Sequence, residues 1–385
     1  MVYLFVGAGQ AGSAIVDDVF AHGGMGIEGA PLALNSTVRD LENLSNIGDD
    51  RWIGVSETEG LVPGTEPGFE ELVVGGFGRR PRQANDVMAD HRDDLVGMLS
   101  ERFGDEGNVP FAFVFLGLGG GTGCGIAPHV VEAIREYAAG GVKVIAVAIL
   151  PNTQDPVHDV SDDEVSAGRQ AENAVYGLDR LEDVVDGIIL VDNQRLGYED
   201  AAEGRFSEYN EYVAGAIVDL VAGPIIEQID PGEFGDVDAP IIDVQDVVTT
   251  LSFGRDPGYG SIGRSVHMTK SLPGYFLPLV GNRDVDATEL GYLAQAKQSV
   301  ESLSFADAEK GLANVRAPRS YISGSRRIDI SEIRRRLREH TSEVNVGMVP
   351  TSRNLVSCTT VYTFEREDVD RIREIEEIAE TYAVA

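Results

Sequence analysis

Lysine is scarce in this sequence: a chain of 385 residues contains only Lys143, Lys270, Lys297 and Lys310. Lysine and arginine together number 31 against 64 aspartates and glutamates, which leaves a formal net charge of -33. Such a negative field repels phosphate backbones and anionic lipids, which argues against nucleic acid and membranes as partners. Because the acids are spread along the whole chain, their mutual repulsion is best tolerated in concentrated salt. The composition therefore predicts a halophilic host, an archaeon.

Cysteine and long apolar runs are also lacking. The two cysteines, Cys124 and Cys358, could form one bridge at most, and Cys124 falls inside a glycine-rich loop, so we expect both thiols to be reduced. The longest apolar run, near 111–118, is much shorter than a membrane span requires. The N-terminus opens directly on a strand-like stretch without a basic leader. We therefore expect a cytoplasmic protein that does not insert into the membrane.

The first half of the chain alternates apolar strand-like runs, at 3–6, 32–34, 111–116, 142–149 and 187–191, with amphipathic stretches. This alternation predicts an α/β fold with a Rossmann-like, mainly parallel sheet. A helix predicted from Phe206 to Val221 ends at Gly223 and Pro224. The mixed pattern after it is typical of an α+β domain. There we expect strands at 275–280, 320–323, 344–349 and 358–364, and helices at 330–340 and 367–385.

The segment GAGQAG, 7–12, lies directly between the first strand and a helix. Its glycines would let a phosphate approach the N-terminus of the helix and its free N–H groups. Taken alone, the segment leaves two alternatives open. A dinucleotide-binding Rossmann fold would require an acid at the end of the second strand, where Asn35 and Ser36 stand instead. The second alternative is a tight turn between strand and helix that binds no ligand.

A second glycine-rich segment, GLGGGTGCG at 117–125, follows a strongly apolar strand and leads into a helix. Five glycines and Thr122 fall within 117–123, whereas a structural turn needs one or two glycines. So dense a run leaves successive backbone N–H groups bare and convergent, which predicts an anion-binding nest. The sequence contains no Gly-Lys-Ser/Thr, so the nest is not a P-loop. Phosphate charge would be met by N–H groups, the helix dipole, Thr122 and Mg²⁺.

The segment GLGGGTGCG resembles the GGGTG signature of tubulins and FtsZ, and GQAGSAIVD, 9–17, is similar to the opening of the archaeal CetZ family. The resemblance extends from the N-terminus to about residue 255. It implies the tubulin/FtsZ fold, with a GTP-binding domain at 1–222 that includes the central helix. An assembly domain at 223–365, with the catalytic loop at its start, and a C-terminal helix at 366–385 would follow.

The resemblance also implies which residues contact GTP or GDP, with Mg²⁺ held mainly by the phosphates and no direct metal ligand from the protein. Asp155 stands where relatives of FtsZ carry a ribose-binding glutamate, and Arg169 approaches the same region. Asn193 would read the guanine edge, as its amide both donates and accepts. Phe206 would stack on the base, and Asn210, on the same helix face, would read it; a core phenylalanine and a solvated asparagine are the alternative. The remaining binding residues carried over are Gly9, Gln10, Ala11, Gly12, Ser13, Ala14, Asn35, Gly78, Gly119, Gly120, Gly121, Thr122 and Gly123.

Beyond the central helix, the segment IIDVQDVVTTL, 241–251, resembles the acidic loop of FtsZ and CetZ, in which carboxylates polarise the water that attacks the γ-phosphate. The resemblance implies a catalytic role for Asp246 first and for Asp243 second, with Ile241 in place of the FtsZ asparagine. Two solvated acids are the alternative in so acidic a chain. In the family fold this loop lies opposite the glycine loops, so hydrolysis would need the acids of a neighbouring subunit in a head-to-tail filament.

The segment GGFGRRPR, 75–82, departs from the family pattern because Arg79, Arg80 and Arg82 follow its glycines. These arginines either add charge near the phosphates, screen an acidic neighbour at the filament interface, or form a solvated surface loop. The six histidines show no spacing typical of metal ligands, and no nucleophile and base stand out as a pair.

The function implied by the resemblance is that of a cytoskeletal GTPase that assembles with itself and acts in cell shape or motility. Other tubulin-like paralogues and shape-control proteins are further candidate partners. Two rival functions stay open. An NAD-dependent oxidoreductase would use the GAGQAG loop, and a tubulin-like switch would bind the nucleotide without hydrolysing it.

Overall fold

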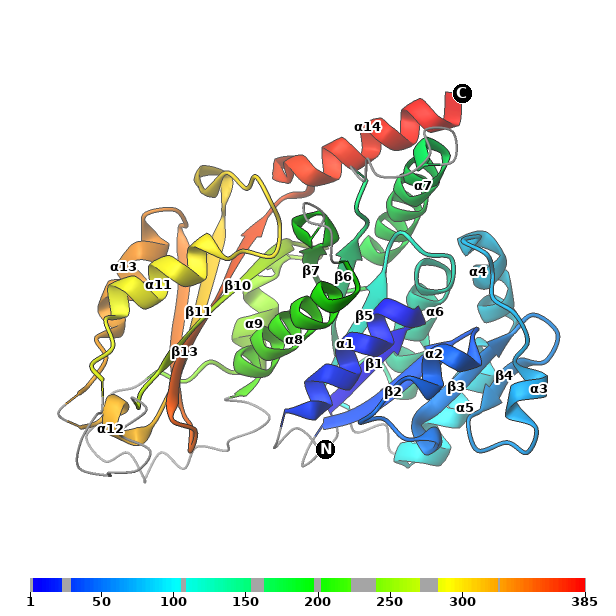
Figure 1. Ribbon diagram of the computed structural model, residues 1–385, viewed down its shortest axis with the longest axis horizontal. Coiled ribbons are helices and arrows are strands. Elements are labelled where there is room, and N and C mark those ends of the chain that lie inside the picture. Colours follow the sequence, from blue (N-terminus) through cyan, green and yellow to red (C-terminus); the bar gives the residue numbers. More distant parts are fainter. Residues whose placement is uncertain are drawn as a thin grey trace.

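The computed structural model describes residues 3–22, 29–104, 109–153, 163–196, 202–222, 240–270, 283–324 and 326–384. Within these residues, strands from both halves of the chain form one sheet of eleven strands (Figure 1). Their order is β12-β11-β13-β10-β7-β6-β5-β1-β2-β3-β4. A separate two-stranded ladder pairs β8 (Ser252–Phe253) with β9 (Asp256–Pro257).

The first half of the sheet is parallel except at its far edge, where β4 runs antiparallel to β3. Its central strands are covered on both faces, so their apolar residues are nearly continuous, as in FAFVFLG of β5. The glycine-rich segments follow β1 and β5, and parallel strands place their carboxyl ends at one edge of the sheet. The strands of this half are β1 (Tyr3–Ala8), β2 (Gly29–Asn35), β3 (Trp52–Ser56), β4 (Gly60–Pro63), β5 (Phe111–Gly117), β6 (Lys143–Leu150) and β7 (Gly187–Asp192).

Helices cover both faces of this half. One face carries α1 (Gly9–Ala21) and the central helix α8 (Ala202–Leu220), and Phe5 of β1 belongs to the apolar core on this side. Leu4 and Val6 point to the opposite core, because successive side chains of a strand face opposite sides. That second face carries α4 (Pro81–Asp90), α5 (Arg92–Phe103), α6 (Thr122–Tyr137) and α7 (Asp163–Glu182). The short helices are α2 (Val38–Glu42), α3 (Phe69–Leu72), η2 (Asp49–Arg51) and η3 (Asn193–Leu196).

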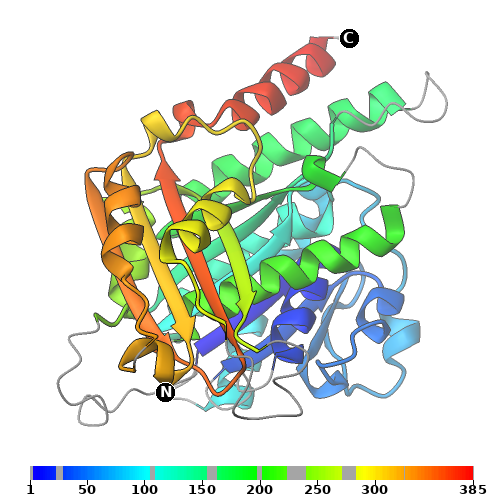
Figure 2. The same cartoon turned by 60° about the vertical axis from the view of Figure 1, so that its left-hand side comes forward.

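The second half extends the same sheet with β10 (Tyr259–Met268), β11 (Lys310–Ala317), β12 (Glu343–Pro350) and β13 (Leu355–Phe364). Its first strand, β10, pairs in parallel with β7 over 259–261, whereas β13 is antiparallel to both β10 and β11. One face of this half carries α11 (Ala287–Ala296) and α13 (Ile330–Arg338) (Figure 2). The opposite face carries α8 and α9 (Val244–Thr250). The short elements are α12 (Arg319–Ile322), η6 (Phe305–Asp307) and η7 (Arg366–Asp368).

The central helix is tied to the second half by a buried ion pair. Asp219 of α8 is 1% exposed, and its carboxylate accepts a hydrogen bond of 2.7 Å from Arg264 of β10. Arg316 of β11 lies 3.5 Å from the other carboxylate oxygen, and the Asn314 amide donates to the Asp219 carbonyl. Breaking one partner of such a pair leaves a buried charge, so α8 is held firmly between the two halves.

The last helix, α14 (Asp370–Val384), returns to the first half of the chain and packs along α7 (Figure 1). Arg366, just before α14, pairs with Asp179 and Glu182 of α7 and with Glu376 of α14. The C-terminal helix is therefore anchored on the first half of the molecule rather than on the strands that precede it.

The predicted α/β class, the parallel sheet and the central helix are confirmed, with α8 beginning at Ala202 rather than Phe206. The strand predicted at 320–323 is wrong, because these residues belong to α12 and the turn after it, with Tyr321 and Ile322 packed into the core. The strand predicted at 275–280 lies outside the described residues. The domain boundaries at 222 and 365 stay predictions, and the sheet runs across the first of them without a break.

Asp18 on α1 gives the fold a pH dependence. Burial, followed by repulsion from Asp17 and Glu211, raises the pKa of Asp18 from 3.8 to about 6. A raised pKa in the folded state means that folding favours the protonated carboxyl of Asp18. The contribution of this group to the free energy of unfolding is therefore complete below pH 3.8 and is lost as the pH rises through about 6. Asp18→Asn should therefore stabilise the protein by about 1–2 kcal/mol at pH 7.5, with the full shift discounted for partial exposure.

Urea unfolding at pH 7.5 and pH 4 tests this expectation, since the gain should vanish at the lower pH. Glu172→Gln, which neutralises an exposed acid of α7, is the matched control and should change stability little at either pH. Equal effects of the two substitutions at pH 7.5 would contradict the assignment to Asp18.

Candidate functional site

An open pocket of about 440 Å³ lies at the carboxyl ends of β1, β2, β5, β6 and β7. It is the place where parallel α/β sheets bind their ligands. Of the residues predicted from sequence, the pocket is lined by Gly9, Gln10, Ala11, Asn35, Gly78, Gly119, Gly120, Gly121, Thr122, Gly123 and Asn193. Other lining residues are Ala8, Ser36, Thr37, Asp40, Gly76, Phe77, Arg79, Gly117, Ile149, Pro151, Asn152 and Gln170.

The loop between β5 and α6 forms the floor of the pocket. The helix begins at Thr122, so the end of the glycine run lies at its N-terminus, where N–H groups are free. A Cβ on Gly120 would meet no atom of the described residues closer than 3.8 Å, so its open side faces the pocket. The buried Cys124 thiol lies 2.7 Å from the carbonyl oxygen of Leu118, and burial raises its pKa, so it closes the loop as a neutral group.

The loop between β1 and α1 touches the floor loop. Gly9 has φ +74°, a left-handed conformation that favours glycine, and a Cβ there would lie 3.0 Å from the amide nitrogen of Gly123. Gly12, in contrast, is needed for packing, since its Cβ would lie 2.1 Å from the carbonyl oxygen of Phe115. Ser13 is buried and donates to the Gly7 carbonyl, and Ala14 does not line the pocket. The structure thus places Gln10 on the pocket and the next turn of α1 behind it.

Polar side chains at the end of β2 form the adjoining wall. Asn35 donates to the Asp40 carboxylate at 3.1 Å and accepts from the Ser36 amide at 2.8 Å. The Ser36 hydroxyl lies 2.7 Å from the Thr122 hydroxyl, which joins this wall to the floor loop. Ser36 and Asp40 were missed as pocket residues because their role depends on the pairing of β2 beside β1, which a local motif does not reveal.

The arginine-rich segment lies against the mouth of the pocket. Arg79 lines it and has φ +60°, an unusual backbone conformation for a residue with a side chain. Its carbonyl accepts a hydrogen bond from the Asn173 side chain at 3.2 Å, and Gly121 packs so closely that a Cβ would lie 2.7 Å from the amide nitrogen of Arg80. Arg82 does not line the pocket, and its guanidinium stacks 5.0 Å from the Tyr176 ring of α7. The three arginines therefore have different surroundings.

The loops after β6 and β7 form the remaining wall. Asn193 lines the pocket directly after β7, and Pro151 and Asn152 line it directly after β6. On α7 the pocket residue is Gln170, while the neighbouring Arg169 is exposed and does not line it. Gln170 was missed because the register of this helix could not be assigned from the motif.

Three other predicted binding residues are not brought to the pocket by any described contact. Asp155 lies outside the described residues. Phe206 belongs to α8, but its side chain is also outside them. Asn210 is partly exposed on α8 and does not line the pocket. Their contacts with a nucleotide stay predictions.

Asp243 and Asp246 form the N-terminal cap of α9. The Asp243 carboxylate accepts from the Asp246 amide at 2.9 Å, and the Asp246 carboxylate accepts from the Asp243 amide at 3.0 Å. This reciprocal capping box satisfies two helix-end donors. Both carboxylates retain oxygen lone pairs for a further partner, because an ionised carboxylate can accept several hydrogen bonds.

The helix α9 lies at the edge of the sheet opposite the pocket. Its residues Gln245 and Thr249 line a separate cavity together with Lys143 and Asp186, which stand at the amino ends of β6 and β7. The large pocket lies at the carboxyl ends of the same strands. One subunit therefore does not bring its own Asp243 and Asp246 to its own pocket.

Metal and membrane signals are absent from the part of the chain that the structure describes. No three His, Cys, Asp or Glu side chains in it are arranged to hold a metal ion. None of its helices combines the length and the apolar character needed to cross a bilayer. Cys124 and Cys358 are buried free thiols.

Comparison with known proteins finds a matching family model and a relative that both point to tubulin-like proteins. A family model described as the tubulin/FtsZ family, GTPase domain, matches residues 83–198. The tubulin-like protein CetZ of Pyrococcus horikoshii is 30% identical over 233 residues, which are 60% of this chain and 54% of that protein. The chain thus aligns with about half the length of this relative.

Solved structures share the fold at lower identity. CetZ1 from Haloferax volcanii, described as a GDP-bound monomer, has a TM-score of 0.72 at 21% identity and is covered over 99% of both chains. CetZ2 from Haloferax volcanii, described as a GTPγS-bound protofilament, has a TM-score of 0.69 at 19% identity, over 99% of this chain and 100% of that one. At these identities the likeness establishes the fold.

Proposed function

Because this chain belongs to the tubulin/FtsZ superfamily, we propose that it binds a guanine nucleotide in the large pocket and hydrolyses GTP where two subunits meet. The proposal rests on the distance between the pocket and the two candidate catalytic acids. The glycine loops lie at one edge of the sheet, and Asp243 and Asp246 lie at the other. A head-to-tail contact would bring the acids of one subunit over the pocket of the next.

In this proposal the floor loop holds the phosphates. The backbone N–H groups of 119–123, the N-terminus of α6 and the Thr122 hydroxyl face that part of the pocket. Asp40 is the acidic side chain among the described lining residues, so a Mg²⁺ ion would take most of its ligands from the phosphates. Asn193, Asp155, Phe206 and Asn210 would contact the base and ribose.

Filament formation is the proposed outcome of these contacts. A structural neighbour described as a GTPγS-bound protofilament supports it, because this chain shares its fold over nearly its whole length. We propose self-assembly as the main partnership and control of cell shape or motility in the cytoplasm as the role. The net charge of -33 makes high salt the condition in which subunits approach one another without strong repulsion.

The turnover of GTP measured against protein concentration tests the proposal. A site completed by a neighbour should give a specific rate that rises steeply with concentration and then levels off. A specific rate that is constant from the lowest concentration would show a self-contained enzyme and would contradict the proposed junction.

A second candidate function is a switch that binds the nucleotide without hydrolysing it. It is favoured by the capping box, because Asp243 and Asp246 already have a structural task in α9. Under this alternative the protein would bind GTP tightly and show no turnover at any concentration. The dinucleotide alternative is less well supported, because both glycine loops line one pocket and NAD binding would leave the second unexplained.

Arg79 should contribute to recognition of the terminal phosphate. It is the one basic side chain among the described residues that line the pocket. Arg79→Ala should weaken GTP binding about tenfold, and GDP binding less, because a charge-assisted hydrogen bond is worth about 1.5–3 kcal/mol. Titration of both nucleotides at high salt measures the difference.

Two further variants control for the backbone and for general charge. Arg79→Gly removes the side chain while suiting the positive φ, so it should bind nucleotides like Arg79→Ala but fold at least as stably. Arg82→Ala removes an arginine that stacks on Tyr176 outside the pocket, and should leave both affinities unchanged. Equal losses for Arg79→Ala and Arg82→Ala would mean that only the overall charge matters.

A further inference from the structure

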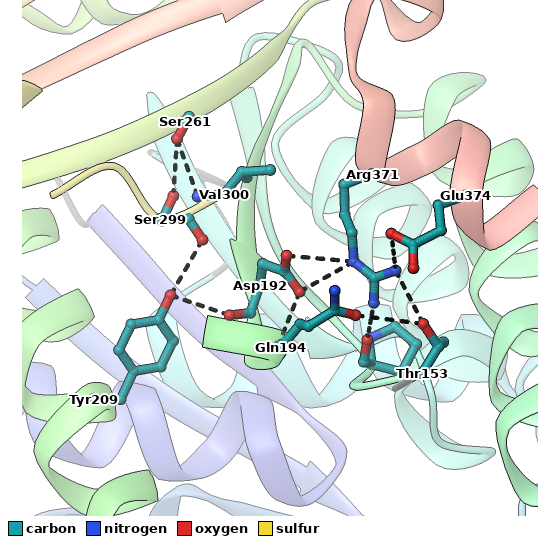
Figure 3. Close-up of polar contacts among 10 residues, drawn as sticks. Thr153, Asp192, Gln194, Tyr209, Ser261, Ser299, Val300, Arg371 and Glu374 are labelled. Atoms are coloured by element: carbon teal, nitrogen blue, oxygen red, sulfur yellow. Dashed lines mark hydrogen bonds and ion pairs between the residues drawn. The ribbon is translucent and has the colours of Figure 1, made fainter. Parts of the chain in front are cut away.

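Arg371 of the C-terminal helix α14 reaches into the wall of the nucleotide pocket. Its side chain is only 3% exposed, although it starts from a helix on the surface of the molecule. The guanidinium Nη2 donates to the Pro151 carbonyl at 2.7 Å, and Nη1 donates to the Thr153 hydroxyl at 3.0 Å (Figure 3). Arg371 thus binds the loop after β6 at two points.

The same guanidinium binds the last residue of β7. Its Nε lies 3.4 Å and 3.3 Å from the two carboxylate oxygens of Asp192, which is completely buried (Figure 3). Asp192 also accepts from the Gln194 amide at 3.0 Å, and its carbonyl accepts from the Tyr209 hydroxyl of α8 at 3.3 Å. Arg371 therefore connects the loop after β6 with the end of β7, from which the next pocket loop starts, through a single planar group.

These loops are the ones that line the pocket. Pro151 and Asn152 come from the first, and Asn193 follows Asp192 in the second. Neither Asp192 nor Arg371 lines the pocket, so neither is placed to touch a bound nucleotide. The five donors of a guanidinium in one plane can satisfy acceptors on two loops at once, which the point charge of a lysine cannot do.

We propose that Arg371 is a positioning residue of the nucleotide pocket, through which the C-terminal helix holds the loops after β6 and β7 in their binding arrangement. This inference rests on the proposed function for the identity of the ligand. It gives α14 a role in nucleotide affinity, and linkage requires the converse: a bound nucleotide strengthens the docking of α14.

The anchoring of α14 on α7 makes the role of Arg371 separable from that of the helix. Arg366 pairs with Asp179, Glu182 and Glu376, and among the residues that the structure describes none of its ion pairs is with the pocket loops. Arg366→Gln therefore weakens the docking of the helix while leaving the loop contacts in place. It is the matched control for Arg371→Gln, which removes the loop contacts and keeps the Arg366 anchor.

The first measurement is hydrogen exchange of the nucleotide-free protein. Arg371→Gln should speed exchange of the amides at 152–153 and 192–194, whereas Arg366→Gln should leave them as in the wild type. Unchanged exchange in Arg371→Gln would overturn the proposal. This outcome does not depend on which nucleotide the pocket takes, so it is distinguishable from a failure of the proposed function, which a wild-type protein unable to bind GTP would reveal.

The second measurement is the dissociation constant for GTP. Arg371→Gln should weaken binding about tenfold, because coupling through a supporting residue is of this size, and Arg371→Lys should weaken it less. Arg366→Gln should have a much smaller effect than Arg371→Gln, because Arg371 still holds the loops and keeps the helix docked. An equal loss in Arg366→Gln would show that helix docking in general is responsible and would overturn the specific role of Arg371. If Arg371→Gln does not fold, Thr153→Val removes one acceptor of the same guanidinium, and an affinity equal to that of the wild type would then refute the proposal.

Discussion

Replacing Asp246 with alanine should reduce GTP turnover by about a hundredfold or more while leaving GTP binding unchanged. In the proposed junction Asp246 polarises the water that attacks the GTP of the neighbouring subunit, so turnover depends on its carboxylate. Binding should be unchanged because Asp246 stands on α9, at the edge of the sheet opposite the pocket of its own subunit. Turnover at saturating GTP, high salt and high protein concentration, beside a nucleotide titration, measures the two effects separately.

The capping box requires its own control, because Asp246→Ala also removes a hydrogen bond that stabilises the start of α9. That loss costs about 1 kcal/mol, too little to unfold the protein. Asp246→Asn keeps an oxygen that can accept from the Asp243 amide but removes the charge. It should therefore fold like the wild type and still be inactive. Full activity of Asp246→Asn would show that Asp246 acts only as a cap.

Replacing Gly120 with alanine should weaken GTP binding about a hundredfold with little change in the stability of the fold. Among the described residues, the added methyl would meet nothing closer than the Gly117 carbonyl oxygen at 3.8 Å, so it enters the open pocket. There it would keep the phosphates from the loop amides, and losing about two charge-assisted hydrogen bonds has this effect on affinity. A titration with GTP, beside thermal unfolding without nucleotide, measures both quantities.

Alanine substitutions at two other glycines serve as controls for this expectation. Gly97→Ala on the exposed side of α5 adds a methyl that meets nothing within 4 Å, so it should gain a little helix stability and bind GTP normally. Gly12→Ala would drive a methyl into the Phe115 carbonyl oxygen, so it should damage folding itself. If Gly120→Ala bound GTP like the wild type, the floor loop would not be the phosphate site.

The two main variants can also be combined in one experiment. Asp246→Ala retains the pocket, and Gly120→Ala retains the acids. In an equal mixture about a quarter of head-to-tail junctions would pair an intact pocket with intact acids, so turnover should reappear. A mixture that stays as inactive as its components would argue against a site shared between neighbours.

The glycine loops and the parallel sheet could be predicted from sequence because their signals are local. A dense glycine run between a strand and a helix has few structural solutions, and β1, β5 and β6 appear as uninterrupted apolar runs. The pocket then follows from the parallel order, which places the ends of these strands together. The strands β10 and β11 were missed because glycine, serine and polar residues interrupt them, and they become strands by pairing with β13.

Other features depend on contacts that no local pattern encodes. Arg371 and Asp192 are far apart in the sequence, and their pairing appears only when α14 packs along α7. The capping box of Asp243 and Asp246 was visible in principle, since an acid three residues after a helix-start residue is its signature. From the sequence these acids were expected to be catalytic or solvated, and the structure adds this third role.

The ladder between β7 and β10 has a mechanical consequence. Because 259–261 pair with 188–190, the two halves of the molecule share backbone hydrogen bonds rather than side-chain contacts alone. A rotation of one half against the other would have to break these bonds, whereas a change in sheet twist would preserve them. If subunits join head to tail as proposed, a load along the filament would therefore cross each subunit through these backbone hydrogen bonds, and the two halves should move together rather than separately.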